Sequence, residues 1–110
     1  MKVSKYLDTE ATLELPGVHK REVINASDGA PTSCMRVFEL EPGSSTPSHS
    51  HAWEHEVYVL SGKGVVEGEG GEKEISRDSV VFVAPNEHHC FKNTGFETLR
   101  FICVIPLVNA

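Results

Sequence analysis

Three of the six histidines in this chain lie within seven consecutive positions. His49, His51 and His55 occur in the stretch "HSHAWEHEVYVLSG", residues 49–62, directly before a run of β-forming residues. Because all three positions are odd-numbered, an extended backbone over 49–56 places their side chains on one face of a sheet. Buried imidazoles need partners for their ring nitrogens, and a metal ion at about 2.0–2.2 Å is such a partner. The spacing H-x-H-x3-H therefore predicts a metal site.

A fourth ligand is expected from a second strand, in the stretch "PNEHHCFKN". His89 shares its parity with Phe91, an apolar residue that favours the interior. His88 shares its parity with Lys92, whose charge favours solvent. His89 is therefore the inward candidate, whereas His19, in the charged segment "HKRE", is expected on the surface.

Two carboxylates compete with His55 for a place in the site. Strict alternation places Glu54 and Glu56 on the face opposite the histidines. A bend at Ala52 and Trp53 would turn Glu56 inward in place of His55. Trp53 itself is expected either to wall the mouth of the pocket or to cover the outside of the barrel.

The rest of the chain reads as short strands separated by turn residues. Gly, Pro, Asn and Asp punctuate the gaps, which is typical of an all-β sandwich or barrel. The segment "TEATLEL", residues 9–15, is consistent with either a short helix or an N-terminal arm. The predicted strands cover residues 19–25, 33–41, 55–62, 64–69, 72–76, 79–85, 88–93 and 98–106.

Alternation along the last predicted strand assigns the lining of a pocket. If Arg100 faces solvent, then Phe101, Cys103 and Ile105 point into the barrel. This lining is apolar and suits an aromatic or alkenyl substrate. Arg36 is the one basic residue considered for the pocket, and it is interpreted as a surface residue.

Composition limits the classes of protein that fit. The 110 residues suffice for one domain, residues 1–110, and the formal net charge of −6 disfavours nucleic-acid binding. No apolar run approaches the roughly 18 residues of a membrane helix, and no signal peptide is evident. Three cysteines without a framework spacing fit buried, reduced thiols, so a cytoplasmic protein is expected.

The paired histidine motifs resemble those of the cupins, which are small β-barrels. The first cupin motif spans about residues 43–62, and the second spans about residues 78–93. The first is matched at Gly43, His49, His51, Glu56 and Gly62, and the second at His89 and Asn93. Three positions of the second motif depart from the family pattern: Asp78 and Asn86 replace glycines, and Ala84 replaces a proline. The resemblance implies an all-β fold, a small double-stranded β-helix or jelly-roll-like cupin barrel.

Within the cupins, "HSHAWEHE" is similar to the four-histidine subgroup of single-domain proteins that bind manganese or iron. The resemblance implies the metal ligands His49, His51, His55 and His89. Glu56 is then beside the site or on the surface, and it is the alternative ligand to His55. Imidazole ligands also suit Zn, Ni and Cu, and the Irving–Williams order favours copper or zinc. Such a ligand set leaves positions of the ion open to water or substrate.

Three functions follow as hypotheses. The first is a metal-dependent oxidoreductase, dioxygenase-like, acting on a small organic substrate. The second is a non-redox isomerase or lyase for a sugar or keto acid, and the third is a non-catalytic module that binds a small molecule. Apolar residues on both faces of "VYVL", residues 57–60, are consistent with a homodimer.

Overall fold

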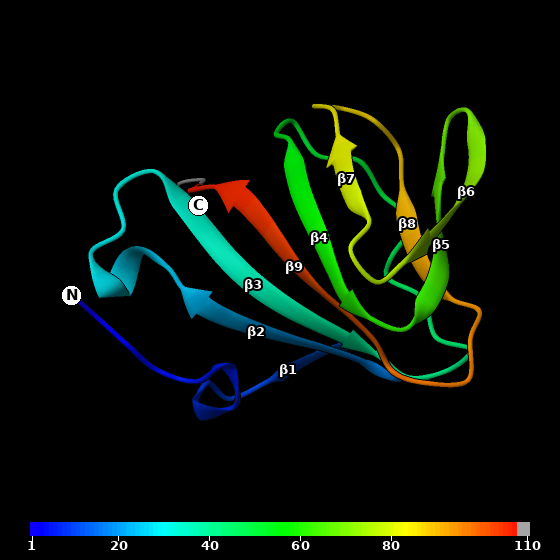
Figure 1. Cartoon of the computed structure of the whole chain (residues 1–110). Helices are drawn as coiled ribbons and strands as arrows, with labels where there is room; N and C mark the ends of the chain where they lie inside the picture. The colour runs from blue at the N-terminus through cyan, green and yellow to red at the C-terminus, as the bar shows by residue number, and fades with distance from the viewer. Residues whose placement is uncertain (108–110) are drawn as a thin grey trace.

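Two antiparallel sheets enclose one buried core in the computed structural model, which describes residues 1–107 (Figure 1). Within these residues, two three-residue 3-10 helices accompany the strands. They are η1 (Tyr6–Asp8) and η2 (Ala26–Asp28). The strands are β1 (Thr12–Leu15), β2 (Val18–Ile24), β3 (Ser33–Leu40), β4 (His55–Ser61), β5 (Lys63–Gly68), β6 (Gly71–Ser76), β7 (Val80–Val83), β8 (Cys90–Asn93) and β9 (Leu99–Pro106).

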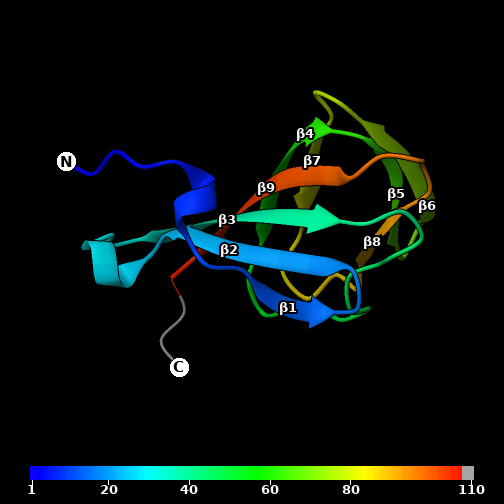
Figure 2. The same cartoon turned by 90° about the horizontal axis from the view of Figure 1, so that it is seen from below.

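The larger sheet has the strand order β1-β2-β3-β9-β4-β7, and the smaller has the order β6-β5-β8. Figure 2 shows β1, β2, β3 and β9 lying side by side in the larger sheet. The long pair β3 and β9 is in register from Ser33 opposite Pro106 to Leu40 opposite Leu99. The predicted all-β jelly-roll barrel is thus confirmed.

The core lies between the two sheets, and strands such as β4 and β9 turn alternate residues toward it. In β4, His55, Val57 and Val59 are buried, whereas Glu56 and Tyr58 are exposed. This is the alternation expected of a strand with one face on the core. The buried cluster contains Val18, Phe38, Leu40, Val57, Val59, Val66, Ile75, Val83, Phe91, Leu99, Phe101 and Cys103.

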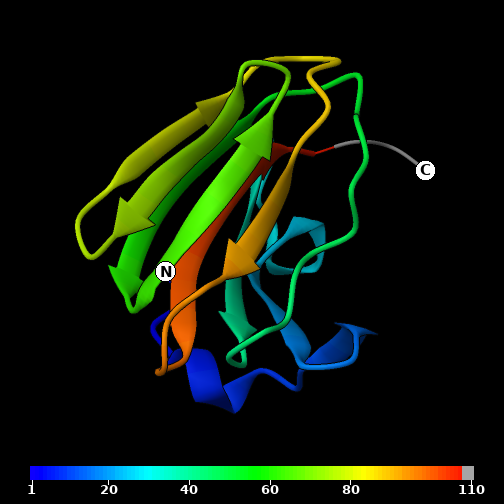
Figure 3. The same cartoon turned by 90° about the vertical axis from the view of Figure 1, so that its right-hand side faces the viewer.

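A segment without regular strand structure, residues 41–54, joins β3 to β4 and runs beside β8 (Figure 3). The amide of Thr46 donates to the Phe91 carbonyl at 2.9 Å. His49 and His89 exchange two backbone hydrogen bonds, of 3.2 and 2.9 Å. Residues directly opposite in an antiparallel pair project to the same face. This pairing therefore brings the two histidine motifs together.

The eight predicted strands agree with β2 to β9 to within two residues at each end, and β1 was not among them. The segment 9–15, for which a helix or an arm was considered, contains the strand β1. The expectation of an extended backbone over 49–56 is wrong, because the chain bends at Ala52 and Trp53 and β4 begins only at His55.

The departures from the cupin motif occupy positions that their side chains tolerate. Asp78 and Asn86 have φ values of 71° and 68°, in the left-handed region where Asp and Asn are the commonest residues after glycine. The amide of Ala84 donates to Oε1 of Glu87 at 3.1 Å. A proline at that position has no N–H to donate. The turn that precedes His89 is therefore held by one side-chain hydrogen bond, together with the backbone bond from the Glu87 amide to the Ala84 carbonyl at 3.1 Å.

The matched Asn93 is a structural residue. It is buried, and its Nδ2 donates to the carbonyls of Leu40 at 2.8 Å and Glu97 at 2.7 Å. Its Oδ1 accepts from the Gly95 amide at 2.9 Å. The side chain thus links β8 to the end of β3 and to the loop before β9.

Gly62 ends the first motif in a conformation that requires glycine. Its φ is 88°, and a Cβ atom there would lie 2.5 Å from the Thr98 carbonyl oxygen. We expect Gly62→Ala to lower the free energy of unfolding by about 2–3 kcal/mol, from left-handed strain and overpacking. Urea denaturation measures this loss. Gly70→Ala is the matched control, because a Cβ at Gly70 meets nothing within 4 Å, and equal stability of both variants would contradict the prediction.

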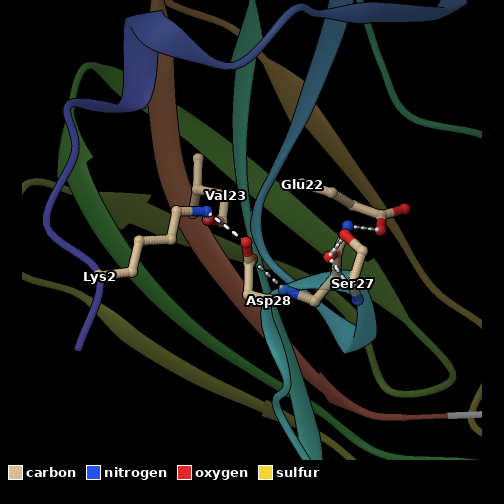
Figure 4. A network of polar contacts seen from close by, with 6 residues as sticks. Lys2, Glu22, Val23, Ser27 and Asp28 are labelled. Atoms are coloured by element: carbon tan, nitrogen blue, oxygen red, sulfur yellow. Dashed lines mark hydrogen bonds and ion pairs between the residues drawn. The ribbon is translucent and has the colours of Figure 1, made fainter.

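The N-terminal segment crosses the outside of the larger sheet. Lys2 Nζ donates to the Val23 carbonyl at 3.0 Å and pairs with Asp28 at 2.8 Å (Figure 4). An Asn25-capped turn holds Asp28 in place, because the backbone amide of Asn25 donates to the Asp28 carboxylate at 3.0 Å.

Within residues 1–107, neither helix has the length and apolar character that crossing a membrane requires.

Candidate metal centre

Four histidine rings line one cavity of about 320 Å³ inside the barrel. His49 and His51 come from the segment before β4, His55 begins β4, and His89 immediately precedes β8. The ring centroids of neighbouring pairs are 4.2 Å apart for His49 and His51, 4.6 Å for His55 and His89, 5.2 Å for His49 and His89, and 5.4 Å for His51 and His55. His51 and His89 are 6.5 Å apart. The structure therefore brings all four sequence-predicted histidines together.

The spacing of these rings fits a shared ion. Imidazoles that bind one ion at about 2.1 Å have ring centres roughly 4.5 Å apart when adjacent and roughly 6.4 Å apart when opposite. Within residues 1–107, however, no three His, Cys, Asp or Glu side chains already point their donor atoms at one position as metal ligands. Binding an ion therefore requires at least some of these rings to rotate about their side-chain torsions.

Two of the rings have polar atoms arranged as a ligand requires. Nδ1 of His89 lies 3.0 Å from the Glu87 carbonyl oxygen, a contact that fixes the ring and leaves Nε2 free, as is usual for metal-binding histidines. Nδ1 of His55 is buried and has no hydrogen-bond partner in the described part of the chain. A buried nitrogen without a partner is costly, and an ion would satisfy it.

The electrostatics of the cavity favour the neutral form of His49, His51 and His55. Burial, reinforced by the charges of His89, Arg36, His51 and His49, lowers the pKa of His55 from 6.5 to about 3. Burial also lowers the pKa of His49 and of His51, in each case with help from neighbouring positive charge. A neutral imidazole is the form that binds a metal, so these side chains are in the ligating state at neutral pH.

The lowered pKa of His55 predicts a pH dependence of the metal-free protein. Below pH 6.5 the unfolded chain binds a proton at His55, whereas the folded protein does not until about pH 3. Stability is therefore lost as the pH falls. Between pH 6.5 and 5, above the range in which carboxylates titrate, His55 should reduce the free energy of unfolding by up to about 2 kcal/mol.

Urea denaturation in the presence of a chelator at pH 7, 6 and 5 measures this loss. His55→Leu should reduce the dependence, with the contributions of His49 and His51 remaining, and His19→Gln, at a histidine outside the cavity, should leave it unchanged. An unchanged slope in His55→Leu would show that His55 is not the group responsible.

The competing residues lie elsewhere. Glu56 is exposed on the outer face of β4, beside Tyr58 and Val104. His88 is also exposed, with its Nε2 2.7 Å from the Ser48 hydroxyl. Trp53 lines the cavity, where its ring stacks on His51 at a centroid distance of 4.4 Å and an angle of 10°.

The interpretation of Arg36 as a surface residue is wrong. Arg36 is half-buried and lines the cavity, where its Nη2 donates to the Cys103 sulfur at 2.9 Å and its guanidinium lies 5.1 Å from the centre of the Phe38 ring. Arg36 shares its parity with Phe38 and Leu40, which are buried. This alternation was the sequence signal that could have placed Arg36 on the inner face of β3. Its pairing with Cys103 across β3 and β9 placed it in the cavity.

The remaining walls are mostly apolar. Phe101 and Cys103 line the cavity, as the strand parity suggested, together with Phe91. Burial raises the pKa of the Cys103 thiol, which is therefore neutral at pH 7. Ile105 does not reach the cavity, because β9 carries it beyond Cys103, where it packs against the core cluster.

Sequence reasoning also missed one ion pair that lines the cavity. Lys20 of β2 pairs with Glu14 of β1 at 2.6 Å, and both side chains are lining residues. The alternation in "ATLEL", residues 11–15, was the available signal for β1, but this segment was interpreted as a short helix or an N-terminal arm, so the ion pair beside the histidines was not anticipated.

Two antiparallel sheets that enclose a histidine-lined cavity define a barrel of the cupin type. The chain belongs to the cupin domain family, whose sequence profile matches residues 36–105.

Two curated proteins with different names are similar to this chain in sequence. The chain is 39% identical over 72 residues to the oxalate-binding protein of Thermotoga maritima, a match that covers 64% of this chain and 60% of that protein. It is 32% identical over 78 residues to the tetracenomycin polyketide synthase protein TcmJ of Streptomyces glaucescens, covering 70% of this chain and 52% of that protein. The chain thus matches less than two thirds of the length of these relatives.

Among solved structures, the polyketide cyclase RemF of Streptomyces resistomycificus superposes with a TM-score of 0.87 at 32% identity. The match covers 96% of this chain and 79% of that chain.

Proposed function

We propose that the protein is a metal-dependent oxidoreductase, dioxygenase-like, that acts on a small organic substrate. The observation that carries this proposal is the set of four histidine rings, drawn from two separate segments, on the wall of one cavity. The proposed ligands are His49, His51, His55 and His89, and the proposed ion is manganese or iron. The names of similar proteins, an oxalate-binding protein and a polyketide cyclase, support a small organic molecule as the ligand.

The side chains around the histidines define what the protein itself contributes. When bound, a redox-active ion supplies one-electron chemistry, and a redox-inert one supplies polarisation of a substrate carbonyl. Phe91 and Phe101 provide flat apolar walls that orient an unsaturated substrate and exclude water from it. Of the charged residues Glu14, Lys20 and Arg36 that line the cavity, only Glu14 is a carboxylate, and it is paired with Lys20.

A second candidate is a non-redox isomerase, cyclase or lyase. The placement of Arg36 in the cavity favours it, because a guanidinium can hold a carboxylate or a developing enolate. Likeness to a polyketide cyclase supports the same reaction class.

Reconstitution of metal-free protein with Mn²⁺, Fe²⁺ or Zn²⁺ separates the two candidates. The proposed oxidoreductase should consume oxygen in the presence of small phenols, diketones or alkenes with manganese or iron and should be inactive with zinc. Turnover with zinc and without oxygen uptake would reject the oxidoreductase in favour of the second candidate. Elemental analysis of protein purified without a histidine tag identifies the ion acquired in the cell.

We also propose a homodimer formed through the outer face of the larger sheet. Tyr58 of β4 and Val80 and Phe82 of β7 are exposed there at 43%, 73% and 63%, and Ile102 and Val104 lie next to them. A contiguous exposed apolar surface is typical of an interface. Sedimentation equilibrium should give a dimer for the wild type and a monomer for Phe82→Glu. A wild-type protein that is still monomeric at a concentration of about 100 μM would reject this interface.

The cytoplasm is the proposed location. Cys34, Cys90 and Cys103 are all buried and none is in a disulfide, which fits a reducing compartment. Cell fractionation tests this location.

A further inference from the structure

The charges around the cavity do not balance. The charged or ionisable side chains that line it are Glu14, Lys20, Arg36, His49, His51, His55, His89 and Cys103. Glu14 and Lys20 neutralise each other in an ion pair of 2.6 Å. The carboxylate of Glu22, which lies opposite Arg36 in the register of β2 and β3, forms no ion pair with it within 4.0 Å and accepts a hydrogen bond from Nδ2 of Asn25. The charge of Arg36 is therefore unpaired, and a divalent ion bound by neutral imidazoles would add two more positive charges.

Arg36 also has unused hydrogen-bonding capacity. A guanidinium has five N–H donors, and the acceptor that Arg36 contacts is the sulfur of Cys103, a weak acceptor. Its Nε is buried and has no acceptor within residues 1–107, and the same is true of Nε1 of Trp53 in the same cavity. In the described part of the chain, no carboxylate forms an ion pair with Arg36 within 4.0 Å. Arg36 and Trp53 therefore contribute donors that have no acceptor, and Arg36 adds an unpaired positive charge.

An acceptor-only anion would satisfy both deficits. A carboxylate matches the planar fork of a guanidinium, whereas a phosphate dianion generally needs several cationic or amide donors. Arg36 is the single unpaired cation of the cavity, which favours the carboxylate. The ring beside it, Phe38, stacks on Phe101 at a centroid distance of 5.2 Å and an angle of 11°, and Phe91 lies 4.7 Å from Phe101. Flat apolar walls of this kind suit an aromatic or conjugated group.

We propose that Arg36 is the substrate-recognition residue of this cavity and that the substrate is a small aromatic or conjugated carboxylate. The carboxylate contacts the guanidinium, and the unsaturated part lies against the phenylalanine rings. This inference rests on the proposed function in one respect, because the bound ion supplies the larger part of the positive charge. The hydrogen bonds and charge that Arg36 offers to a carboxylate do not depend on the ion.

Isothermal titration calorimetry with benzoate tests the proposal, and benzamide serves as a probe of the same shape without the charge. Wild-type protein loaded with Mn²⁺ should bind benzoate at least tenfold more tightly than benzamide. Arg36→Met should weaken benzoate binding by about 10–100-fold, because a charge-assisted hydrogen-bond pair is lost, and should leave benzamide binding unchanged. Arg36→Lys should recover only part of the affinity, since it keeps the charge and loses the fork.

The matched control is Arg77→Met, which removes one positive charge from an exposed turn outside the cavity. It should bind benzoate as the wild type does. Equal affinity of the wild type for benzoate and benzamide, no benzoate binding at millimolar concentration, or tighter binding of inorganic phosphate than of benzoate would each overturn the proposal. So would a folded Arg36→Met that binds benzoate within twofold of the wild type. If the variants fail to fold, the same comparison of benzoate with benzamide on metal-free wild-type protein tests the carboxylate preference without the ion, and equal affinities there would overturn the proposal.

Repeating the titration on metal-free protein separates this inference from the proposed function. Benzoate binding that depends on Arg36 in a protein that takes up no metal would leave the role of Arg36 intact and reject the metal-dependent function. Tight Mn²⁺ binding together with a benzoate affinity that does not change in Arg36→Met would support the metal site and reject the role of Arg36.

Discussion

His89→Ala should weaken metal binding by about a hundredfold or more. Apparent binding free energies of four-ligand protein zinc sites are about 10–16 kcal/mol, so one ligand accounts for roughly 3 kcal/mol. His89 is also the ligand contributed by the second motif, and its backbone pairing with His49 unites the two halves of the site. Competition with a chromophoric chelator, using Mn²⁺ and Zn²⁺ in turn, measures the affinity.

The neighbouring histidine is the control for this experiment. His88 is exposed and bonded to Ser48, so His88→Ala should keep its metal affinity within about twofold. The fold of His89→Ala should persist, because the buried apolar cluster does not include His89, and circular dichroism checks this. Metal affinity unchanged in a folded His89→Ala protein would remove His89 from the ligand set and the second motif from the site.

His55→Ala should cause a loss of metal affinity of similar size, whereas Glu56→Ala should cause almost none. His55 is 4% exposed and lines the cavity, and Glu56 is exposed on the opposite face of β4. In β4, successive side chains point to opposite faces, so the two residues cannot both face the ion. Electron spin echo spectroscopy of the Mn²⁺-loaded protein should detect one fewer coordinated nitrogen in His55→Ala.

The reverse result would have a specific structural meaning. A one-residue shift of β4 would turn Glu56 inward and would expose Val57 and Val59. The observed register opposes this shift, because Val57 lies opposite Cys103 in β9 and opposite Val81 in β7. Loss of metal binding in Glu56→Ala with retention in His55→Ala would therefore contradict the strand register as well as the proposed ligand set.

Local patterns explain why much of the fold was predictable. Strand positions followed from runs of β-branched and aromatic residues between Gly, Asn, Asp and Pro, since backbone conformation at turns depends on a few neighbouring residues. β1 was missed although "TLEL" alternates polar and apolar residues, because four residues are too few to distinguish a strand from one turn of a helix and all four are exposed. The bend at Ala52 and Trp53 was considered as an alternative, but nothing in the residue types alone decided it.

The sequence by itself determined which residues could serve as metal ligands. The spacing of His49, His51 and His55 and the parity of His89 with Phe91 are properties of neighbours along the chain, and the four rings do line one cavity. Only the tertiary structure decided what surrounds them. Arg36 reaches the cavity because β3 pairs with β9 in a register that sets it opposite Cys103, and Glu14 and Lys20 reach it because β1 folds back on β2. Contacts of this kind depend on the register between strands far apart in sequence, which no local pattern specifies.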